Sequence, residues 1–131
     1  MPSFGRDELL TGSEIADVAD YVLSMSGRAG DVSAEALARG QETYDIQCAS
    51  CHMPDGTGDR MQGAPNLVDQ DWLYGSSREQ VINIIHRGPY GVMPAWEGRL
   101  NDATIDALAA YVYLLGGGEE AEGAANGPTG R

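Results

Sequence analysis

Cys48, Cys51 and His52 are the residues whose types and spacing most directly indicate chemistry in this sequence of 131 residues. The two cysteines are the only ones in the chain, and His52 directly follows the second of them. A C-x-x-C-H run is the attachment signature of haem c, in which both thiols form thioethers with the haem vinyl groups and the histidine binds the iron. The motif therefore predicts one covalent haem c, held by Cys48 and Cys51, with His52 as an axial iron ligand.

Three other interpretations of the cysteine pair have less support in the sequence. A disulfide across so short a loop would constrain the unfolded chain very little. A structural zinc site needs four ligands, and the chain has no second pair of cysteines or histidines at ligand spacing. A thioredoxin-like redox pair requires a βαβ pattern, which the flanking sequence does not show. Thiol–disulfide exchange stays open as an alternative, which free thiols in the mature protein would favour.

The second axial ligand of such a haem is often a methionine thioether, a soft ligand that favours ferrous iron. Met93 is the best-placed methionine, because it directly precedes Pro94 in a loop before a predicted C-terminal helix, and the proline keeps the backbone extended around it. Met53 and Met61 lie too near the attachment site to reach the opposite face of the haem, and Met25 falls within a predicted helix. We therefore predict Met93 as the second iron ligand.

The elements that must position these residues are predicted to be helices. Residues 102–115 have apolar side chains three and four positions apart, with Asn101 placed to cap the helix and a glycine placed to end it. Residues 34–47 form a second predicted helix with Ser33 as its cap, and residues 77–86 form a third. The expected fold class is therefore all-α, with three to four helices around one haem.

The first 27 residues repeat the run that begins at Met93. Met1, Pro2 and Phe4 match Met93, Pro94 and Trp96. With two extra residues allowed in the first copy, Ile15, Val18, Ala19, Tyr21 and Val22 match Ile105, Leu108, Ala109, Tyr111 and Val112. Any amphipathic helix would share the apolar spacing, but not the Met-Pro-small-aromatic run before it. We interpret the similarity as a repeat.

The repeat predicts how the chain is organised. Residues 1–27 are expected to be the end of a preceding cytochrome c domain, 28–33 a linker, 34–117 a complete domain and 118–131 a disordered tail. Met1 is then a candidate ligand for the haem of the preceding domain. It is also an alternative ligand for the haem at His52 if neighbouring domains exchange loops. The chain is expected to be part of a longer protein that carries a second haem.

The charge of the chain excludes some classes of partner. The sequence has 20 acidic and 8 basic residues, which give a formal net charge of −12. A nucleic-acid backbone or an anionic membrane surface needs a basic footprint, so we expect neither as a partner. The longest apolar run is 107–115, far below the roughly 20 residues that span a bilayer. Acidic residues gathered near a haem edge would instead attract a basic redox partner.

Several runs of the sequence resemble known cytochromes. The spacing of Gly40, Tyr44 and the C-x-x-C-H motif resembles the opening of class I cytochromes c, and Leu108-x-x-Tyr111 resembles their closing helix. Three further runs resemble the second haem domain of the CcoP/FixP (subunit III) family of cbb3-type cytochrome c oxidases: GAPNL at 63–67, DWLYGS at 71–76 and GVMPAW at 91–96. The runs at 1–5 and 14–18 resemble the end of that family's first haem domain.

The resemblance implies a class I cytochrome c fold and roles for further residues. The carbonyl group of Pro65 would accept the Nδ1–H of His52, and the glycine at position 40 would let the first and last helices cross closely. Apolar residues would line the haem, namely Leu67, Ile85 and Val92. Residues expected to hold the haem propionates are Trp72, Tyr74, Arg87 and Trp96. In two places the chain departs from the family pattern: Met53 stands where a glycine usually follows the haem histidine, and Pro89-Tyr90 lengthen the approach to Met93.

The function that the resemblance implies is electron transfer to the haem–copper centre of a cbb3-type oxidase. The chain would be an electron-transfer subunit rather than a catalyst by itself, with other oxidase subunits and a cytochrome electron donor as partners. It would lie on the periplasmic side of the bacterial inner membrane and associate with the membrane only through its parent protein or complex. The alternatives are an independent soluble monohaem shuttle and a haem-based gas sensor or peroxidase.

Overall fold

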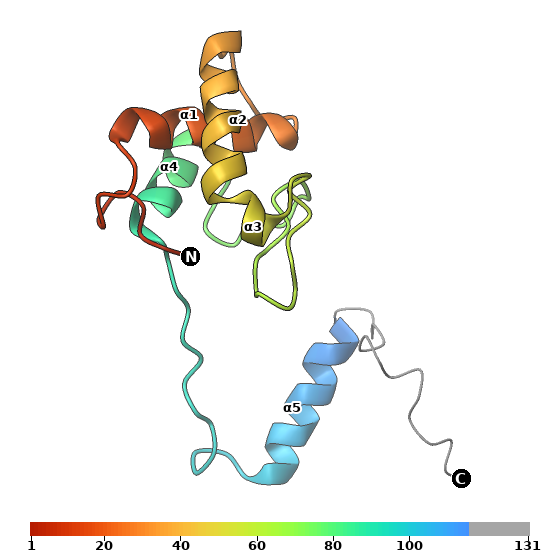
Figure 1. Cartoon of the computed structure of the whole chain (residues 1–131). Coiled ribbons are helices and arrows are strands. Elements are labelled where there is room, and N and C mark those ends of the chain that lie inside the picture. The colour runs from red at the N-terminus through yellow and green to blue at the C-terminus, as the bar shows by residue number, and fades with distance from the viewer. Residues whose placement is uncertain (116–131) are drawn as a thin grey trace. The chain divides into compact units, whose positions relative to one another are not determined.

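The computed structural model describes residues 1–115, which form helices and no strand (Figure 1). The helices are α1 (Gly12–Met25), α2 (Ala34–Gln47), α3 (Ala49–His52), α4 (Arg78–Arg87) and α5 (Asp102–Leu115). The predicted all-α fold of class I cytochromes c is confirmed, and two predicted helices have the bounds that the sequence indicated. The third begins and ends one residue later than predicted. The predicted tail, 118–131, and the helix-ending Gly116 lie outside the described residues.

The described residues divide into two compact units, Met1–Gly91 and Val92 onward. Unit 1 therefore contains residues 1–27 together with the haem motif, and unit 2 contains Met93 and α5. The predicted division places residues 34–117 in one domain, because its boundaries were taken from the sequence repeat and not from contacts in the structure. Each unit is described here by itself.

Local signals start and stop the helices of unit 1. The Thr11 hydroxyl accepts the N–H of Glu14, and the Glu14 carboxylate accepts the N–H of Thr11 at 2.7 Å, so a capping box begins α1. A second box, between Ser77 and Gln80, begins α4. Gly88 ends α4 in the left-handed conformation, with φ +54°, which glycine adopts without a Cβ penalty.

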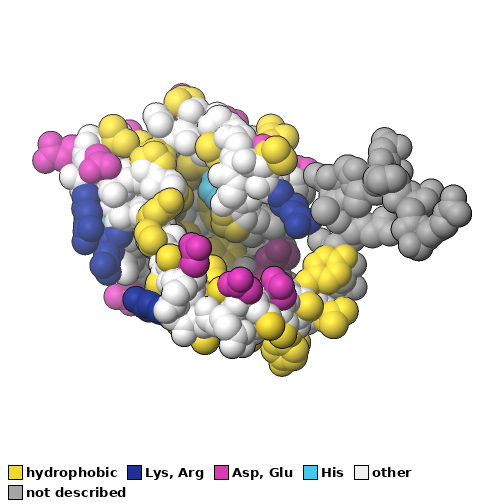
Figure 2. Space-filling model, turned by 90° about the horizontal axis from the view of Figure 1, so that it is seen from below, with side chains coloured by type: hydrophobic (Ala, Val, Ile, Leu, Met, Phe, Trp, Pro, Cys, Tyr) yellow, Lys and Arg dark blue, Asp and Glu magenta, His cyan; other side chains and the backbone are white. Residues whose placement is uncertain are grey.

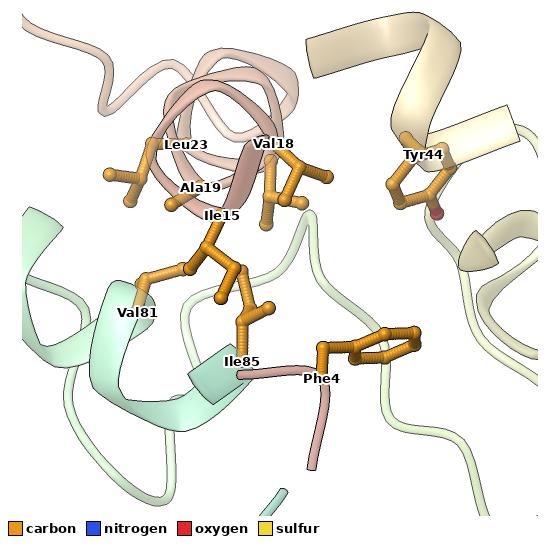
Figure 3. Close-up of a cluster of buried hydrophobic side chains, with 9 residues drawn as sticks. Phe4, Ile15, Val18, Ala19, Leu23, Tyr44, Val81 and Ile85 are labelled. Atoms are coloured by element: carbon orange, nitrogen blue, oxygen red, sulfur yellow. The ribbon is translucent and has the colours of Figure 1, made fainter. Parts of the chain in front are cut away.

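The core of unit 1 forms where α1 packs against α2 and α4. The fully buried side chains Ile15, Val18 and Tyr44 lie there. Figure 3 shows side chains of α1 facing Val81 and Ile85 of α4, with Phe4 beside them from the N-terminal segment. Most of the buried apolar side chains of this unit therefore come from the first 27 residues and from the two helices they contact.

Gly40 marks the closest approach of two helices in unit 1. A Cβ atom at this position would overlap the carbonyl oxygen of Asp17 and approach the Cβ of Tyr21 to 2.9 Å. The helix that crosses α2 here is therefore α1, whereas the family resemblance implied the last helix of the chain. Tyr21 also packs its ring 5.4 Å from that of Tyr44. The first copy of the repeat can make this crossing because it carries the apolar pattern of the last helix.

Unit 2 begins with a turn that leads into α5. The carbonyl oxygen of Trp96 accepts the N–H groups of Arg99 and Leu100, and the guanidinium of Arg99 lies 5.7 Å from the centroid of the Trp96 ring. Asn101 caps α5, since its side chain accepts the N–H of Thr104 at 2.9 Å. No residue of α5 is buried. Within residues 1–115, no helix has the length and apolar character needed to cross a membrane.

Candidate haem site

The C-x-x-C-H motif occupies a single tight turn where α2 gives way to α3. Cys48 closes α2, and its carbonyl oxygen accepts the N–H of Cys51 at 3.1 Å and of His52 at 2.9 Å. Met53 follows with φ +65°, in the left-handed region that favours glycine, and its carbonyl oxygen accepts the Tyr44 hydroxyl at 2.7 Å. This conformation explains why the related pattern has a glycine directly after the histidine.

His52 is 8% exposed, and its Nδ1 atom lies 3.0 Å from the carbonyl oxygen of Pro65. A carbonyl oxygen can only accept, so Nδ1 carries a proton, and Nε2 is the ring nitrogen whose lone pair can bind a metal in the neutral imidazole. This is the arrangement that a metal-binding histidine needs, because the bond fixes both the tautomer and the direction of the ring. The contact is the one that the family resemblance implied for these two residues.

The loop between residues 53 and 66 places the Pro65 carbonyl. Gly58 donates its N–H to the carbonyl oxygen of His52 at 2.9 Å, and Asp59 and Ala64 exchange two backbone hydrogen bonds at 3.0 and 2.9 Å. A Cβ atom at Gly58, where φ is +79°, would lie 2.5 Å from the Ala64 carbonyl oxygen and 2.7 Å from that of Pro65. The glycine therefore permits the close approach that brings Pro65 over His52.

A cavity of about 670 Å³ lies in unit 1 beside this turn. Its size falls within the range of roughly 300–1,000 Å³ that is typical of cofactor sites. Cys48 and His52 line it, and most of the other lining side chains are apolar or aromatic. Predicted site residues that line it are Met1, Cys48, His52, Pro65, Leu67, Trp72, Tyr74 and Ile85. A planar apolar group attached at Cys48 would fit here with His52 beside it.

The two thiols differ in their surroundings. Burial raises the pKa of the Cys48 thiol to about 11, with a further contribution from nearby Cys51. Cys51 is exposed, and its Sγ lies 3.3 Å from Oε1 of Gln62, another residue that lines the cavity. A redox-active thiol normally has a lowered pKa, so the Cys48 environment gives thiol–disulfide exchange no support. Among residues 1–115, no group of three or more His, Cys, Asp or Glu side chains could hold a metal ion. A structural zinc site therefore gains no support from the structure either.

Of the residues predicted to hold the haem propionates, some line the cavity and others do not. Trp72 lines the cavity, donates its indole N–H to the carbonyl oxygen of Asp69 at 3.2 Å, and carries the Arg28 guanidinium 5.5 Å from its ring centroid. Tyr74 also lines the cavity and is half exposed. Arg87 is exposed in the last turn of α4 and is not among the residues that line the cavity.

Met93 and Trp96, the remaining predicted site residues, belong to unit 2. Their side chains are 81% and 42% exposed. The predicted haem-lining Val92 is in the same unit and is 75% exposed. The structure therefore brings eight predicted site and haem-lining residues together at the cavity, and the methionine among them is Met1.

Sequence reasoning missed that the first repeat builds part of the cavity wall. Phe4, Val18 and Val22 line the cavity together with Met1, and all of them come from residues 1–27. The signal was present in the repeat, because Phe4 and Val18 match Trp96 and Leu108. The domain division predicted from the repeat places those first-copy positions in a preceding domain instead.

Similarity to known proteins identifies the family. Residues 35–112 match the family described as cytochrome c oxidase, cbb3-type, subunit III. The FixP subunit of the cbb3-type oxidase of Bradyrhizobium diazoefficiens is 48% identical over 119 residues, which cover 91% of this chain and 41% of the relative. The CcoP subunits of Cereibacter sphaeroides and Azospirillum sp. strain B510 are 47% and 44% identical, again over 91% of this chain and 40% and 41% of each relative.

The chain thus spans about two fifths of the length of these curated relatives. The family match includes the C-x-x-C-H turn, the Pro65 carbonyl and the Met93 run, and it begins within α2. It covers more than half of the 131 residues. The chain therefore belongs to the cbb3-type cytochrome c oxidase subunit III family.

Proposed function

We propose that this chain transfers single electrons by means of one covalently attached haem c and relays them within a cbb3-type cytochrome c oxidase. The observation that carries the proposal is the C-x-x-C-H turn beside an apolar cavity, with the Nδ1 atom of His52 already fixed by Pro65. The family membership supports the same conclusion, because it is a cytochrome family. The number of haems in the parent protein, predicted to be two, is part of the proposal.

Cys48 and Cys51 would hold the haem through thioethers, and Nε2 of His52 would bind its iron. A bound haem c supplies one-electron exchange between ferric and ferrous iron. A methionine thioether from one of the two Met-Pro runs would be the second iron ligand, and Met93 is the residue that the sequence predicts. With His52 and a methionine both bound to the iron, oxygen would find no vacant site, so oxygen reduction would belong to the haem–copper centre of the complex.

The side chains around the cavity tune this exchange. Leu67, Ile85 and Phe4 line the cavity and would keep water away from the haem, and a dry shell would raise the reduction potential because it disfavours the extra charge of ferric iron. The Pro65 carbonyl would increase electron donation from His52 through the Nδ1–H bond, which would favour ferric iron. The final potential is set by the balance of these opposing effects.

Membership of the family supports a proposal for the partners and the location of the chain. We propose that other cbb3 oxidase subunits bind the parent protein, and that a cytochrome supplies the electrons. One electron leaves the donor and one enters the acceptor in each cycle, without a proton. Haem c is attached outside the bacterial cytoplasm, so the chain would act on the periplasmic side of the inner membrane. The net charge of −12 would favour a donor with a basic docking face.

The test is a comparison of the two histidines in the full chain, exported by a cleavable leader so that haem is attached. We expect the unaltered chain to show a low-spin c-type spectrum that reduces and reoxidises reversibly. His52→Ala should abolish the low-spin spectrum, whereas His86→Ala should keep it. Two free thiols per mature chain without haem would contradict the proposal, and so would an unchanged spectrum in His52→Ala.

A further inference from the structure

The two repeats share a local backbone structure as well as a sequence pattern. In the first repeat (residues 1–25), the carbonyl oxygen of Phe4 accepts the N–H groups five and six positions later at 2.9 and 3.1 Å. In the second repeat (residues 93–115), the carbonyl oxygen of Trp96 accepts the N–H groups three and four positions later, also at 2.9 and 3.1 Å. A helix of 14 residues follows each turn. The two extra residues of the first repeat therefore lie inside one equivalent turn.

The first repeat forms one wall of the haem cavity. Met1, Phe4, Val18 and Val22 all line it, and Phe4 is only 4% exposed. The side chain of Met1 is 48% exposed, which leaves it partly covered at the edge of the same cavity. Thus a methionine, an aromatic side chain and an amphipathic helix from the first repeat stand beside His52.

The start of the first repeat packs closely against the end of α4. Gly5 and Arg6 both donate their N–H groups to the carbonyl oxygen of His86, each at 3.2 Å. A Cβ atom at Gly5 would overlap the ring of His86. The second repeat has Glu97 in the position of Gly5, so it cannot dock on α4 in the same way unless the His86 ring moves.

Two ion pairs also distinguish the repeats. Asp20 of α1 is 5% exposed and binds Arg78 of α4 through two parallel bonds of 2.6 and 2.9 Å. Asp17 binds Arg39 of α2 in the same two-bond manner, at 2.7 and 3.3 Å. Bidentate pairs of this kind add geometric specificity as well as energy. At the corresponding positions of α5 the second repeat has alanines, at 107 and 110, and cannot form either pair.

We propose that the two repeats are alternative closing segments for the single haem crevice at His52, and that the first repeat is the preferred one. Met1 rather than Met93 is then the methionine ligand of this haem in the chain. The second repeat closes the crevice when the first is withdrawn, for instance when a preceding haem domain claims it. This inference rests on the proposed function, because the crevice must hold a haem.

The first test identifies the ligand in the haem-loaded full chain, exported behind a cleavable leader so that Met1 is retained. Methionine ligation gives ferric haem c a weak sulfur-to-iron absorption band. We expect Met1→Ala to lose at least about 90% of this band and Met93→Ala to keep it, because an equilibrium biased tenfold or more leaves the minor form under a tenth. Loss of the band only in Met93→Ala would overturn the inference.

The same spectra separate this inference from the proposed function. A chain that takes up haem but lacks the band before any substitution would refute methionine ligation itself. A chain that takes up no haem would refute the proposed function. Two results would refute the exchange of repeats and leave the proposed function intact. One is a band that is lost only in Met93→Ala, and the other is a band that persists when both methionines are replaced.

A second test moves the two carboxylates from one repeat to the other and measures amide hydrogen exchange in the haem-loaded chain. In the unaltered chain we expect α1 amides to exchange at least about 100-fold more slowly than those of α5. The transfer variant combines Asp17→Ala and Asp20→Ala with Ala107→Asp and Ala110→Asp. It should shift protection toward α5 and make the band sensitive to Met93→Ala.

The control for the transfer variant carries the two α5 substitutions alone and should leave α1 protected. Sedimentation should give a monomer for the unaltered chain at all concentrations tested. The inference is overturned if α5 is the protected helix of the unaltered chain, if protection does not follow the carboxylates, or if closure occurs only in a dimer.

Discussion

α1 and α5 have the same length and follow equivalent turns, yet their side chains have different surroundings. Six residues of α1 are buried, and none of α5 is. The matched residues Val18 and Leu108 are 0% and 47% exposed. Figure 2 shows hydrophobic side chains, in yellow, exposed on this face of the molecule. Local sequence therefore determines that each segment is a helix, and tertiary contacts determine how far each is buried.

The difference between the repeats lies in residues that make docking contacts. Asp20, Asp17 and Gly5 of the first repeat contact α4 and α2, and their counterparts in the second repeat are two alanines and a glutamate. Alanine is the best helix former, so α5 loses no intrinsic helicity through these changes. The second repeat thus keeps its helix without the residues that dock the first one.

The largest contrast is expected from the matched substitutions Ile15→Ala and Ile105→Ala. Ile15 is 2% exposed in the core of unit 1, so its truncation should lower the free energy of unfolding by about 2–5 kcal/mol. Ile105 belongs to a helix without buried residues, and its truncation should cost less than about 1 kcal/mol. Denaturant titration of the haem-loaded chain, followed by circular dichroism, measures both values.

Equal losses of unfolding free energy for the two isoleucine variants would contradict the difference between α1 and α5, because they would mean that both helices are equally buried in solution. A larger cost at position 105 would reverse it and identify α5 as the closing helix. Leu108→Ala, which alters an apolar residue of α5 that is 47% exposed, provides a second measurement of the same helix.

The next largest effect is expected at the crossing of α1 and α2. Gly40→Ala places a methyl group where the Asp17 carbonyl oxygen lies, so α1 must shift, at a cost of about 1–3 kcal/mol. Gly12→Ala is the matched control, because no atom lies within 4 Å of a Cβ there. It should be neutral or stabilise by up to about 1 kcal/mol. Thermal unfolding of the two variants measures the difference, and a harmless Gly40→Ala would mean that α1 does not cross at that glycine.

Much of this fold could be predicted from residues close together in the sequence. The bounds of α2 and α5 follow from Ser33, Asn101 and the apolar spacing, because caps and periodicity act within one or two turns. Which helix crosses α2 at Gly40 could not be predicted in this way. That choice depends on Asp17 and Asp20 meeting arginines 22 and 58 residues away, and nothing in the local pattern indicates those partners.

The side of the haem site that contains the C-x-x-C-H motif could be predicted from the sequence better than the side that contains the methionine ligand. The side of Cys48, Cys51 and His52 lies within one turn of backbone, and its sequence spacing is specific. The contact of His52 with Pro65 was implied by family resemblance alone, since the geometry of the intervening loop depends on Gly58. On the methionine side the sequence predicts Met93 and leaves Met1 as an alternative, because the repeat supplies two Met-Pro runs.

The stability of the folded chain should also depend on pH in the alkaline range, because Tyr44 lies at the contact between α1 and α2. Burial, more than the nearby Cys48, raises the pKa of Tyr44 to about 12, and the hydroxyl donates to Met53. A raised pKa favours the neutral phenol in the folded chain. Stability from this group is therefore complete below the unfolded pKa of about 10 and is lost as the pH rises toward 12.

Tyr44→Phe should remove this alkaline loss and, at neutral pH, cost about 1 kcal/mol for the missing hydrogen bond. Tyr111→Phe in α5, where the tyrosine is 60% exposed, is the control and should change neither value. Stability measured at several pH values between 8 and 12 gives the result. An identical alkaline slope in Tyr44→Phe would show that another group titrates.

The smallest effect is expected at the helix starts, where α1 has the capping-box carboxylate of Glu14 and α5 has the hydroxyl of Thr104. Hydrogen bonds from Thr11 lower the pKa of Glu14, whereas the matched residue Thr104 has no charge to lose. A lowered pKa means that the ionised form is favoured in the folded chain. The contribution of Glu14 is thus present above the ordinary value of 4.5 and is lost as the pH falls through the lowered value.

Glu14→Gln should therefore flatten the acid limb of the stability profile slightly and leave neutral stability almost unchanged. The effect is small because the group is fully exposed to solvent. Thr104→Ser, which keeps a hydroxyl next to the Asn101 cap, is the control and should leave the acid limb unaltered. If Glu14→Gln instead left the acid limb as steep as before, the cap of α1 would carry no pH dependence. The two repeats would then differ only in their docking contacts.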